Sequence, residues 1–303
     1  MISIISTLYN SESTALSFVE QVLKTMNEIH EEEFELLLVS DGDATISSSL
    51  ENKLISLDSR IKFIKLSRNF GQHIAIYCGL EKSIGDEIII LDSDLEENPQ
   101  DISNFLKELR KNNFEIVIGL QDERNKDSFF GMLYWKAISW NRKTPANLCT
   151  IRAFTRKYAN FILECKDESI ILVDIDSHIG FRKGYLKVHK TYKGVSSYSM
   201  KKKLEFFLSS LILGNPKILI YASSVIAFLA FTFIVAASGI TIFRLSAELD
   251  SGWASIIVSI FVSMSFNLIS FGVIFFYLSR ILNQVRARPR YVIDEIKSIK
   301  QND

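Results

Sequence analysis

Residues 87–96 read Glu-Ile-Ile-Ile-Leu-Asp-Ser-Asp-Leu-Glu, an unbroken apolar run followed at once by three alternating acidic residues. The run Glu87–Leu91 has the length and the branched side chains of a buried strand. Alternate side chains of an extended segment point to one side, so we expect the carboxylates of Asp92, Asp94 and Glu96 to face the same way. Taken alone, the pattern would also suit a solvated acidic strand end.

Similar apolar runs alternate with helix-period segments on both sides of this stretch. The expected strands are Ile2–Leu8, Phe34–Val39, Ile61–Leu66, Glu87–Leu91 and Glu115–Ile118. The expected helices are Ser13–Glu28, Ile46–Leu57, Gly71–Ile84 and Pro99–Asn112. Alternation of this kind predicts an α/β domain with a mostly parallel sheet flanked by helices.

Polar residues follow three of the expected strands, where ligands of such sheets bind. Thr7–Asn10 follow the first strand, Ser40–Gly42 the second and Asp92–Glu96 the fourth. No glycine-rich GxGxxG or GxxxxGK[ST] loop is present, which counts against dinucleotide and P-loop sites. A hard cation such as Mg²⁺ often takes one or two carboxylates plus substrate phosphates. The acidic residues within Asp92–Glu96 therefore predict a metal ion that neutralises a phosphate ligand.

The overall composition narrows the class of protein. The 303 residues carry 35 basic and 35 acidic side chains, and this balance argues against a nucleic-acid-binding protein. The three cysteines, Cys78, Cys149 and Cys165, have no metal-ligand spacing and read as inert thiols in a reducing compartment. Met1 leads straight into an expected strand rather than a secretory signal, so we expect this domain to stay in the cytoplasm.

Two long stretches near the C-terminus, 218–243 and 253–279, contain no charged residue. Each exceeds the roughly 20 apolar residues that a helix needs to cross a bilayer, so we expect two transmembrane helices. The alternative interpretation is a pair of helices buried in the core of a domain. Lysines and arginines flank the pair on both outer sides, which places both flanks and both termini in the cytoplasm. The segment 201–217 is basic and then apolar, typical of an interfacial helix or, alternatively, of a surface helix packed on the domain.

The chain is therefore expected to divide into six parts. These are a cytoplasmic domain at 1–200, an amphipathic interfacial segment at 201–217, transmembrane helices at 218–243 and 253–279, an external loop at 244–252 between them, and a basic cytoplasmic tail at 280–303.

Three stretches carry a resemblance to a known family: STLYNSE at Ser6–Glu12, LLLVSDG at Leu36–Gly42, and LSRNFGQHIAIYCGLEKSIGDEIIILDSDLEENP at Leu66–Pro99. With these motifs the chain resembles the family 2 glycosyltransferases of the GT-A fold. Within them it is most similar to the polyprenyl-phosphate glycosyltransferases, which include dolichyl-phosphate mannose synthase and the bacterial GtrB-type glucosyltransferases. Two membrane helices after the catalytic domain also fit the GtrB type.

The resemblance implies a role for each matching residue. Thr7, Tyr9 and Asp41 would hold the nucleotide; Asp92 and Ser93 would contact the nucleotide sugar; Asp92, Asp94 and Glu96 would bind Mg²⁺ or Mn²⁺; Asp94, Arg124, Arg152 and Arg156 would form the catalytic centre; Ser196 and Tyr198 would lie on the acceptor side.

The implied reaction transfers a hexose from a nucleotide sugar to a polyprenyl phosphate at the cytoplasmic face of the membrane. UDP is the expected nucleotide and glucose the default sugar, and the family resemblance suggests a homo-oligomer, a tetramer. Asp174 and Asp176 keep a second acceptor open, a saccharide hydroxyl with one of them as the base. Ser40 and Gln121 depart from the family pattern and leave a third interpretation, a membrane scaffold that binds nucleotide sugar without catalysis.

Overall fold

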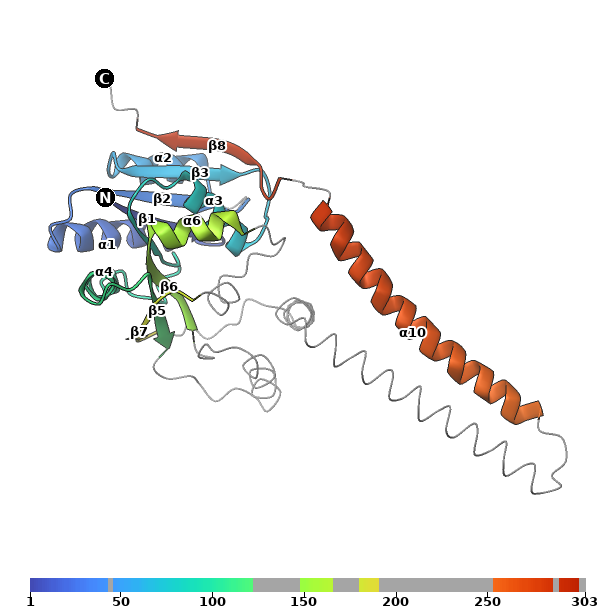
Figure 1. Ribbon diagram of the computed structural model, residues 1–303. Coiled ribbons are helices and arrows are strands. Elements are labelled where there is room, and N and C mark those ends of the chain that lie inside the picture. Colours follow the sequence, from blue (N-terminus) through green and yellow to red (C-terminus); the bar gives the residue numbers. More distant parts are fainter. Residues whose placement is uncertain (43–45, 122–147, 166–179, 191–252, 286–288, 300–303) are drawn as a thin grey trace. The chain divides into compact units, whose positions relative to one another are not determined.

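The structure is a computed structural model that describes residues 1–42, 46–121, 148–165, 180–190, 253–285 and 289–299 (Figure 1). The chain forms two compact units. One comprises Met1–Ser197 together with Pro289–Asp303, and the other comprises Tyr198–Arg288.

Within the described residues, the first unit contains one sheet of eight strands in the order β7-β5-β6-β4-β1-β2-β3-β8. The strands are β1 Ile2–Leu8, β2 Phe34–Ser40, β3 Ile61–Leu66, β4 Glu87–Ile90, β5 Ile116–Gln121, β6 Leu148–Thr155, β7 Lys183–Val188 and β8 Ile293–Ser298. The strands β4, β1, β2 and β3 run parallel to one another, and β7 runs parallel to β5. The prediction of a mostly parallel α/β sheet is confirmed, with β6 and β8 as antiparallel additions.

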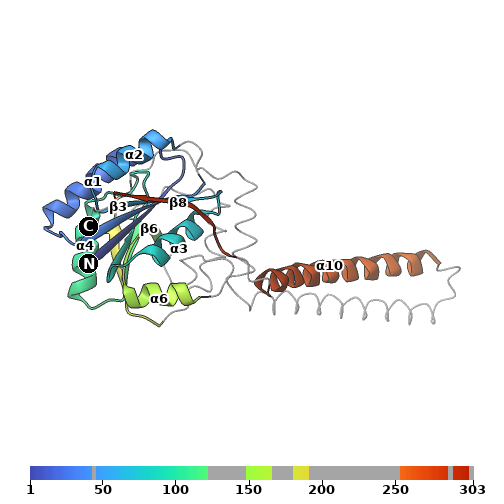
Figure 2. The same ribbon diagram turned by 90° about the horizontal axis from the view of Figure 1, so that it is seen from above.

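Helices cover both faces of the sheet, as Figure 2 shows from above. They are α1 Ala15–Glu28, α2 Ser48–Ser56, α3 Gln72–Lys82, α4 Asp101–Lys111 and α6 Arg156–Glu164. Because neighbouring residues of a strand point to opposite faces, β1 serves two cores: Ile4 packs with the residues of α1, α2 and α4, and Ile5 with those of α3 and α6. These two apolar layers hold the carboxyl ends of the parallel strands in place.

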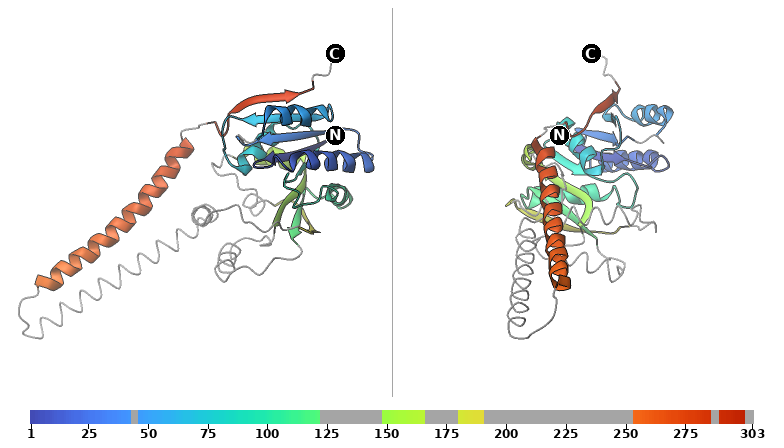
Figure 3. Two further views of the ribbon diagram at one scale, coloured as in Figure 1. Left: turned by 180° about the vertical axis from the view of Figure 1, so that it is seen from behind. Right: turned by 90° about the vertical axis from the view of Figure 1, so that its right-hand side faces the viewer.

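The C-terminal residues differ from the sequence prediction of a separate basic tail at 280–303. The strand β8 pairs antiparallel with β3, and the N–H of Ser67 donates to the carbonyl of Val292 at 3.0 Å (Figure 3). Lys297 of β8 also donates to the buried carboxylate of Glu51 at 2.5 Å. Residues 289–298 are thus part of the first unit, a placement that their charged sequence did not reveal.

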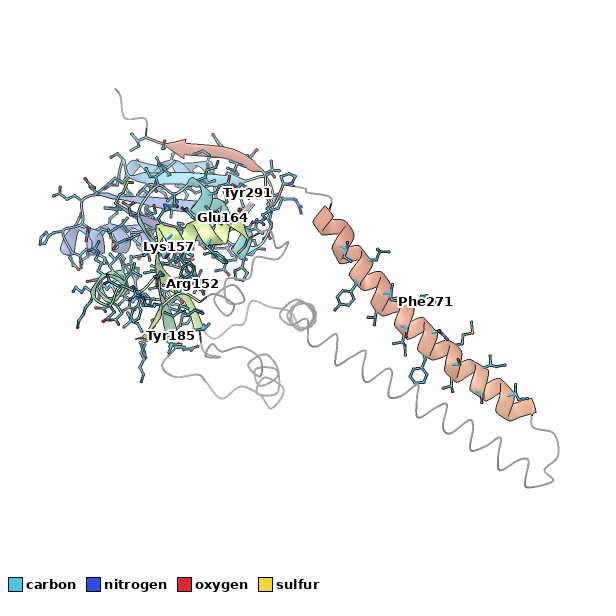
Figure 4. All side chains as sticks on the ribbon, viewed as in Figure 1. Arg152, Lys157, Glu164, Tyr185, Phe271 and Tyr291 are labelled. Atoms are coloured by element: carbon cyan, nitrogen blue, oxygen red, sulfur yellow. The ribbon has the colours of Figure 1, made fainter. Side chains whose placement is uncertain are left out.

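The helix α10 spans Trp253–Val285, and so includes the uncharged stretch predicted to be a second membrane span. Large apolar side chains along it, among them Phe271, are exposed (Figure 4). Among the residues that the structure describes, no helix meets the combined requirement of length and hydropathy for crossing a membrane. The predicted interfacial segment, first span and external loop, at 201–252, lie outside the described residues.

Candidate functional site

The carboxyl ends of β1, β2 and β4 meet at one edge of the sheet, where Leu8 is in register with Ser40. The hydroxyl of Ser93, just after β4, donates to the carbonyl of Thr7 at 2.8 Å and lies 2.9 Å from the hydroxyl of Ser11. The side chain of Tyr9 is 52% exposed beside them. The structure therefore brings together three residues that were predicted to bind the nucleotide sugar.

Asp41 follows β2 and is buried. Its two carboxylate oxygens accept hydrogen bonds from the backbone N–H groups of Phe70, at 2.7 Å, and Gly71, at 2.9 Å. Burial raises the pKa of Asp41, and these two hydrogen bonds only partly oppose that rise. Its carboxylate thus fixes the loop before α3, and the predicted contact with the nucleotide remains a prediction.

Two glycines shape this loop, one through its backbone conformation and the other through a close backbone contact. Gly71 has a φ of +100°, a backbone conformation that residues with a Cβ rarely adopt. Gly42 has a φ of +62°, and a Cβ placed there would lie 2.1 Å from the backbone carbon of Arg68. The backbone of Gly42 is therefore packed against the backbone of Arg68 and Asn69.

Asp92 is the first carboxylate of the acidic turn, residues 92–97. Its Oδ1 accepts a hydrogen bond of 2.6 Å from the side-chain amide of Gln72 at the start of α3. Burial raises the pKa of Asp92 to about 6, and the charge of Asp94 adds to the rise, while the hydroxyl of Thr150, the charge of Lys190 and the Gln72 amide oppose it. Asp92 and Asp94 therefore lie close enough for the charge of one to affect the other.

The carboxylate of Glu96 is paired with a lysine from the region after β7. The backbone N–H of Glu96 donates to Oδ1 of Asp94 at 2.9 Å, and its carboxylate pairs with Lys190 at 3.0 Å. Leu95 has a φ of +60°, which ends the extended conformation on which the expected alternation depended. Lys190, just after β7, is thus a cation of the site.

Glu97 is a further carboxylate that the sequence analysis missed, and it is fully buried. Its Oε1 accepts a hydrogen bond of 2.9 Å from the backbone N–H of Thr150 in β6. Burial and the charge of Asp92 raise the pKa of Glu97 to about 7. Its Oε2 has no hydrogen-bond partner among the described residues. Strict alternation would have turned Glu97 away from the site, and the turn at Leu95 reverses that expectation.

Arg152 lies on β6 in register with Ile90, near the end of β4 and therefore near the acidic turn (Figure 4). It is buried, and its guanidinium donates to the carbonyls of Thr150 at 3.1 Å and Cys149 at 3.3 Å. Burial and the charge of Arg152 lower the pKa of His73 to about 4, so this histidine is neutral at physiological pH.

Arg156 does not join this group, which corrects its predicted catalytic role. Since β6 runs antiparallel to β4, Thr155 is already opposite Glu87 at the far edge of the sheet. The guanidinium of Arg156 donates there to the carbonyl of Gly85 at 2.8 Å and to the hydroxyl of Ser83 at 3.1 Å. Arg156 therefore stabilises the turn before β4. Arg124, Ser196, Tyr198, Asp174 and Asp176 lie outside the described residues.

The fit to a divalent ion is partial. Among the described residues, no group of three histidine, cysteine, aspartate or glutamate side chains is arranged to hold a metal. The predicted ligand Glu96 is paired with Lys190 instead. Asp92 and Asp94 remain as two neighbouring carboxylates, which suit an ion such as Mg²⁺ or Mn²⁺ that takes its other ligands from substrate phosphates and water.

Comparison with known proteins places this geometry in a family. The family model described as glycosyl transferase family 2 matches residues 3–189. The chain is 27% identical over 312 residues to an undecaprenyl-phosphate 4-deoxy-4-formamido-L-arabinose transferase of Proteus mirabilis, covering 99% of this chain and 95% of that protein. It is 26% identical over 301 residues to a protein of Mycobacterium tuberculosis named among putative glycosyltransferases, covering 97% and 88%.

Solved structures show the same fold at lower identity. The M. tuberculosis glucosyl-3-phosphoglycerate synthase matches with a TM-score of 0.50 and 14% identity, over 71% of this chain and 80% of that one. The same enzyme in complex with Mn²⁺, UDP and phosphoglyceric acid also matches with a TM-score of 0.50. Given the match over residues 3–189 and the sheet that carries it, the chain belongs to glycosyl transferase family 2 and is a glycosyltransferase.

Proposed function

We propose that this glycosyltransferase moves a sugar from a nucleotide sugar to the phosphate of a polyprenyl lipid at the cytoplasmic face of the membrane. One observation carries the choice of acceptor. The similarity to the undecaprenyl-phosphate transferase of P. mirabilis extends over 99% of the chain and so includes the uncharged stretches as well as the catalytic domain. A UDP-linked hexose, with glucose as the default, is the first donor to test, and the arabinose derivative named for that relative is the second.

The chemistry of a phosphate acceptor suits the residues of this site. A phosphomonoester has a second pKa of about 6, so it is largely dianionic at neutral pH and needs no strong base to attack the anomeric carbon. Two anionic groups must nevertheless approach one another. Arg152 and Lys190 lie beside the acidic turn and supply positive charge for that encounter.

Binding of the donor is proposed to involve the same sheet edge. The residues around Thr7 and Tyr9 would hold the nucleotide, and Asp92 and Asp94 would face its diphosphate. Mg²⁺ or Mn²⁺, held by these two carboxylates and the diphosphate, would neutralise the charge that develops on the departing nucleoside diphosphate. Gln72 orients Asp92 through its 2.6 Å hydrogen bond, so the carboxylate is positioned before the donor binds.

A membrane anchor would bring the lipid to this edge. Support comes from the two uncharged stretches, 218–243 and 253–279, and from the exposed apolar side chains of α10. The lysines and arginines that flank the two stretches favour a cytoplasmic catalytic domain. A tetramer remains a prediction from the family resemblance.

The experiment is a donor screen that is read out on extracted lipids. The purified full-length protein is reconstituted with undecaprenyl phosphate and Mg²⁺ or Mn²⁺, and labelled UDP-sugars are added one at a time. Label in the lipid fraction is the expected result. Label only in a saccharide acceptor would move the assignment to the hydroxyl-acceptor reaction with Asp174 or Asp176 as base. Donor binding without transfer to either acceptor would leave only the scaffold.

A further inference from the structure

Lys190 occupies an unusual place among the charges of the site. The acidic turn carries Asp92, Asp94, Glu96 and Glu97 within six residues of sequence. Lys190 reaches this turn from just beyond β7, with its ammonium group 3.0 Å from Oε2 of Glu96 and its side chain only 21% exposed. A lysine this far from the turn in sequence is therefore brought in by the tertiary fold.

The charge of Lys190 acts on more than its hydrogen-bond partner. Burial lowers the pKa of Lys190, but the hydrogen bond to Glu96 and the charges of Glu97, Glu96 and Asp92 outweigh that effect and raise it, so the ammonium stays protonated. The same charge opposes the burial that raises the pKa values of Asp92 and Glu97. Lys190 thus interacts with three of the four carboxylates of the turn.

We infer that Lys190 is a built-in counter-ion of the acidic turn, which stabilises the turn before the donor binds and competes electrostatically with the divalent ion expected at Asp92 and Asp94. This inference rests on the proposed function. Its physical basis is that a protonated lysine and a divalent cation repel one another when both neutralise the same carboxylates.

The chemical nature of the side chain fits such a role. A lysine ends in a compact charge on a flexible four-carbon stem, so its ammonium can leave Glu96 for a nearby phosphate oxygen without a backbone movement. The turn would then exchange one counter-ion for another as the donor diphosphate and its cation arrive. Lys190 is thereby a positioning residue, because its ammonium pairs with Glu96 and its charge acts on neighbouring carboxylates of the site.

The test compares Lys190→Met with Lys190→Arg, which keeps the charge, and with the matched control Lys187→Met, which removes an exposed charge from β7, the strand just before Lys190. Binding of Mn²⁺ is measured by titration calorimetry on the full chain with saturating UDP, and thermal stability is measured with and without Mn²⁺. For Lys190→Met we expect Mn²⁺ to bind about ten-fold tighter, with a lower Tm when metal is absent. Lys190→Arg and Lys187→Met should bind Mn²⁺ as the wild type does.

Unchanged or weaker Mn²⁺ binding by Lys190→Met would overturn the inference. If that variant is poorly folded without metal, Mn²⁺ must raise its Tm by more than it raises that of the wild type, and an equal rise would also overturn the inference. Failure here is separable from failure of the proposed function. If Lys190→Met binds Mn²⁺ as the wild type does while the wild type still forms labelled lipid, only the role of Lys190 is wrong. If Lys190→Met binds Mn²⁺ more tightly but no labelled lipid forms, only the proposed acceptor is wrong.

Discussion

The carboxylate of Asp41 accepts the backbone N–H of Gly71 at 2.9 Å, and so joins the end of β2 to the residue before α3. Because Gln72, the first residue of that helix, donates to Asp92, the contact links the residues proposed to hold the nucleotide to the acidic turn. Gly71 has a positive φ at this point. This relationship leads to the first prediction.

Asp41→Asn should destabilise the domain and weaken donor binding. The side-chain NH₂ group of asparagine would face one of the two backbone N–H groups that Asp41 now accepts. That N–H would stay buried without an acceptor, which costs about 1–3 kcal/mol in the free energy of unfolding. Chemical denaturation and the KM for the donor measure the two effects. Asp86→Asn, an exposed aspartate at the opposite sheet edge, serves as the control and should change the stability by less than about 0.5 kcal/mol.

Asp94→Asn should abolish transfer without affecting folding. The asparagine Oδ1 can still accept the N–H of Glu96, so the local turn is retained while a charge is lost. We expect turnover to fall by about 100-fold or more, on the scale of losing one electrostatic contact to the transition state. Labelled lipid formed per folded protein is the measurement. Near-normal turnover would remove Asp94 from the site.

Arg152 and Arg156 can be compared directly, because Arg152 lies near the carboxyl end of β4 and Arg156 near its amino end. Arg152→Met should lower turnover at least about 10-fold, because it removes positive charge beside the acidic turn. Arg156→Met should instead lower the stability, through its lost bonds to Gly85 and Ser83, and leave turnover per folded molecule close to that of the wild type. The reverse pattern would restore the catalytic role for Arg156 that its sequence motif suggested.

Glu35 should make the stability depend on acid pH. Burial alone would raise its pKa, but hydrogen bonds from Lys62, Ser3 and the N–H of Ile84 outweigh burial and lower the pKa below its ordinary value of 4.5. A lowered folded pKa means that the stabilisation is complete above the unfolded pKa and is lost as the pH falls through the folded one.

The measurement compares the wild type with Glu35→Gln by urea denaturation across a pH series. At pH 7 the variant should be less stable by about 2 kcal/mol. The gap should narrow steadily below about pH 4.5, since protonated Glu35 resembles glutamine. A gap that stayed constant down to pH 3 would show that shape rather than charge makes Glu35 stabilising.

Removal of residues 289–303 should destabilise the catalytic domain although no predicted site residue is lost. Truncation deletes β8, its ladder to β3, and the packing of Arg290 over the ring of Tyr77 at 4.5 Å. We expect a loss of more than about 2 kcal/mol in the free energy of unfolding. Denaturation of full-length and truncated proteins measures it. Equal stability would return these residues to the status of a separate tail.

Local sequence determined much of this protein. The strands were predictable because both faces of a parallel strand are buried, so Ile2–Leu8 and Phe34–Val39 are rich in apolar residues on both faces. The location of the site was also predictable, since the carboxyl ends of parallel strands meet there. Thr7 lies in the last two residues of β1, and Asp92 and Ser93 follow β4. Periodicity and the order of elements are local properties, so one sequence suffices to read them.

Tertiary structure decided what pairs with what. Lys190 pairs with Glu96 across 94 residues of chain, Arg156 falls on the wrong edge because β6 is antiparallel, and the charged strand β8 joins β3 from the far end of the sequence. None of these follows from local pattern, because the direction of an inserted strand and the partner of a charge depend on the packing of distant segments. Those contacts form, and contribute to stability, only once the whole sheet has assembled.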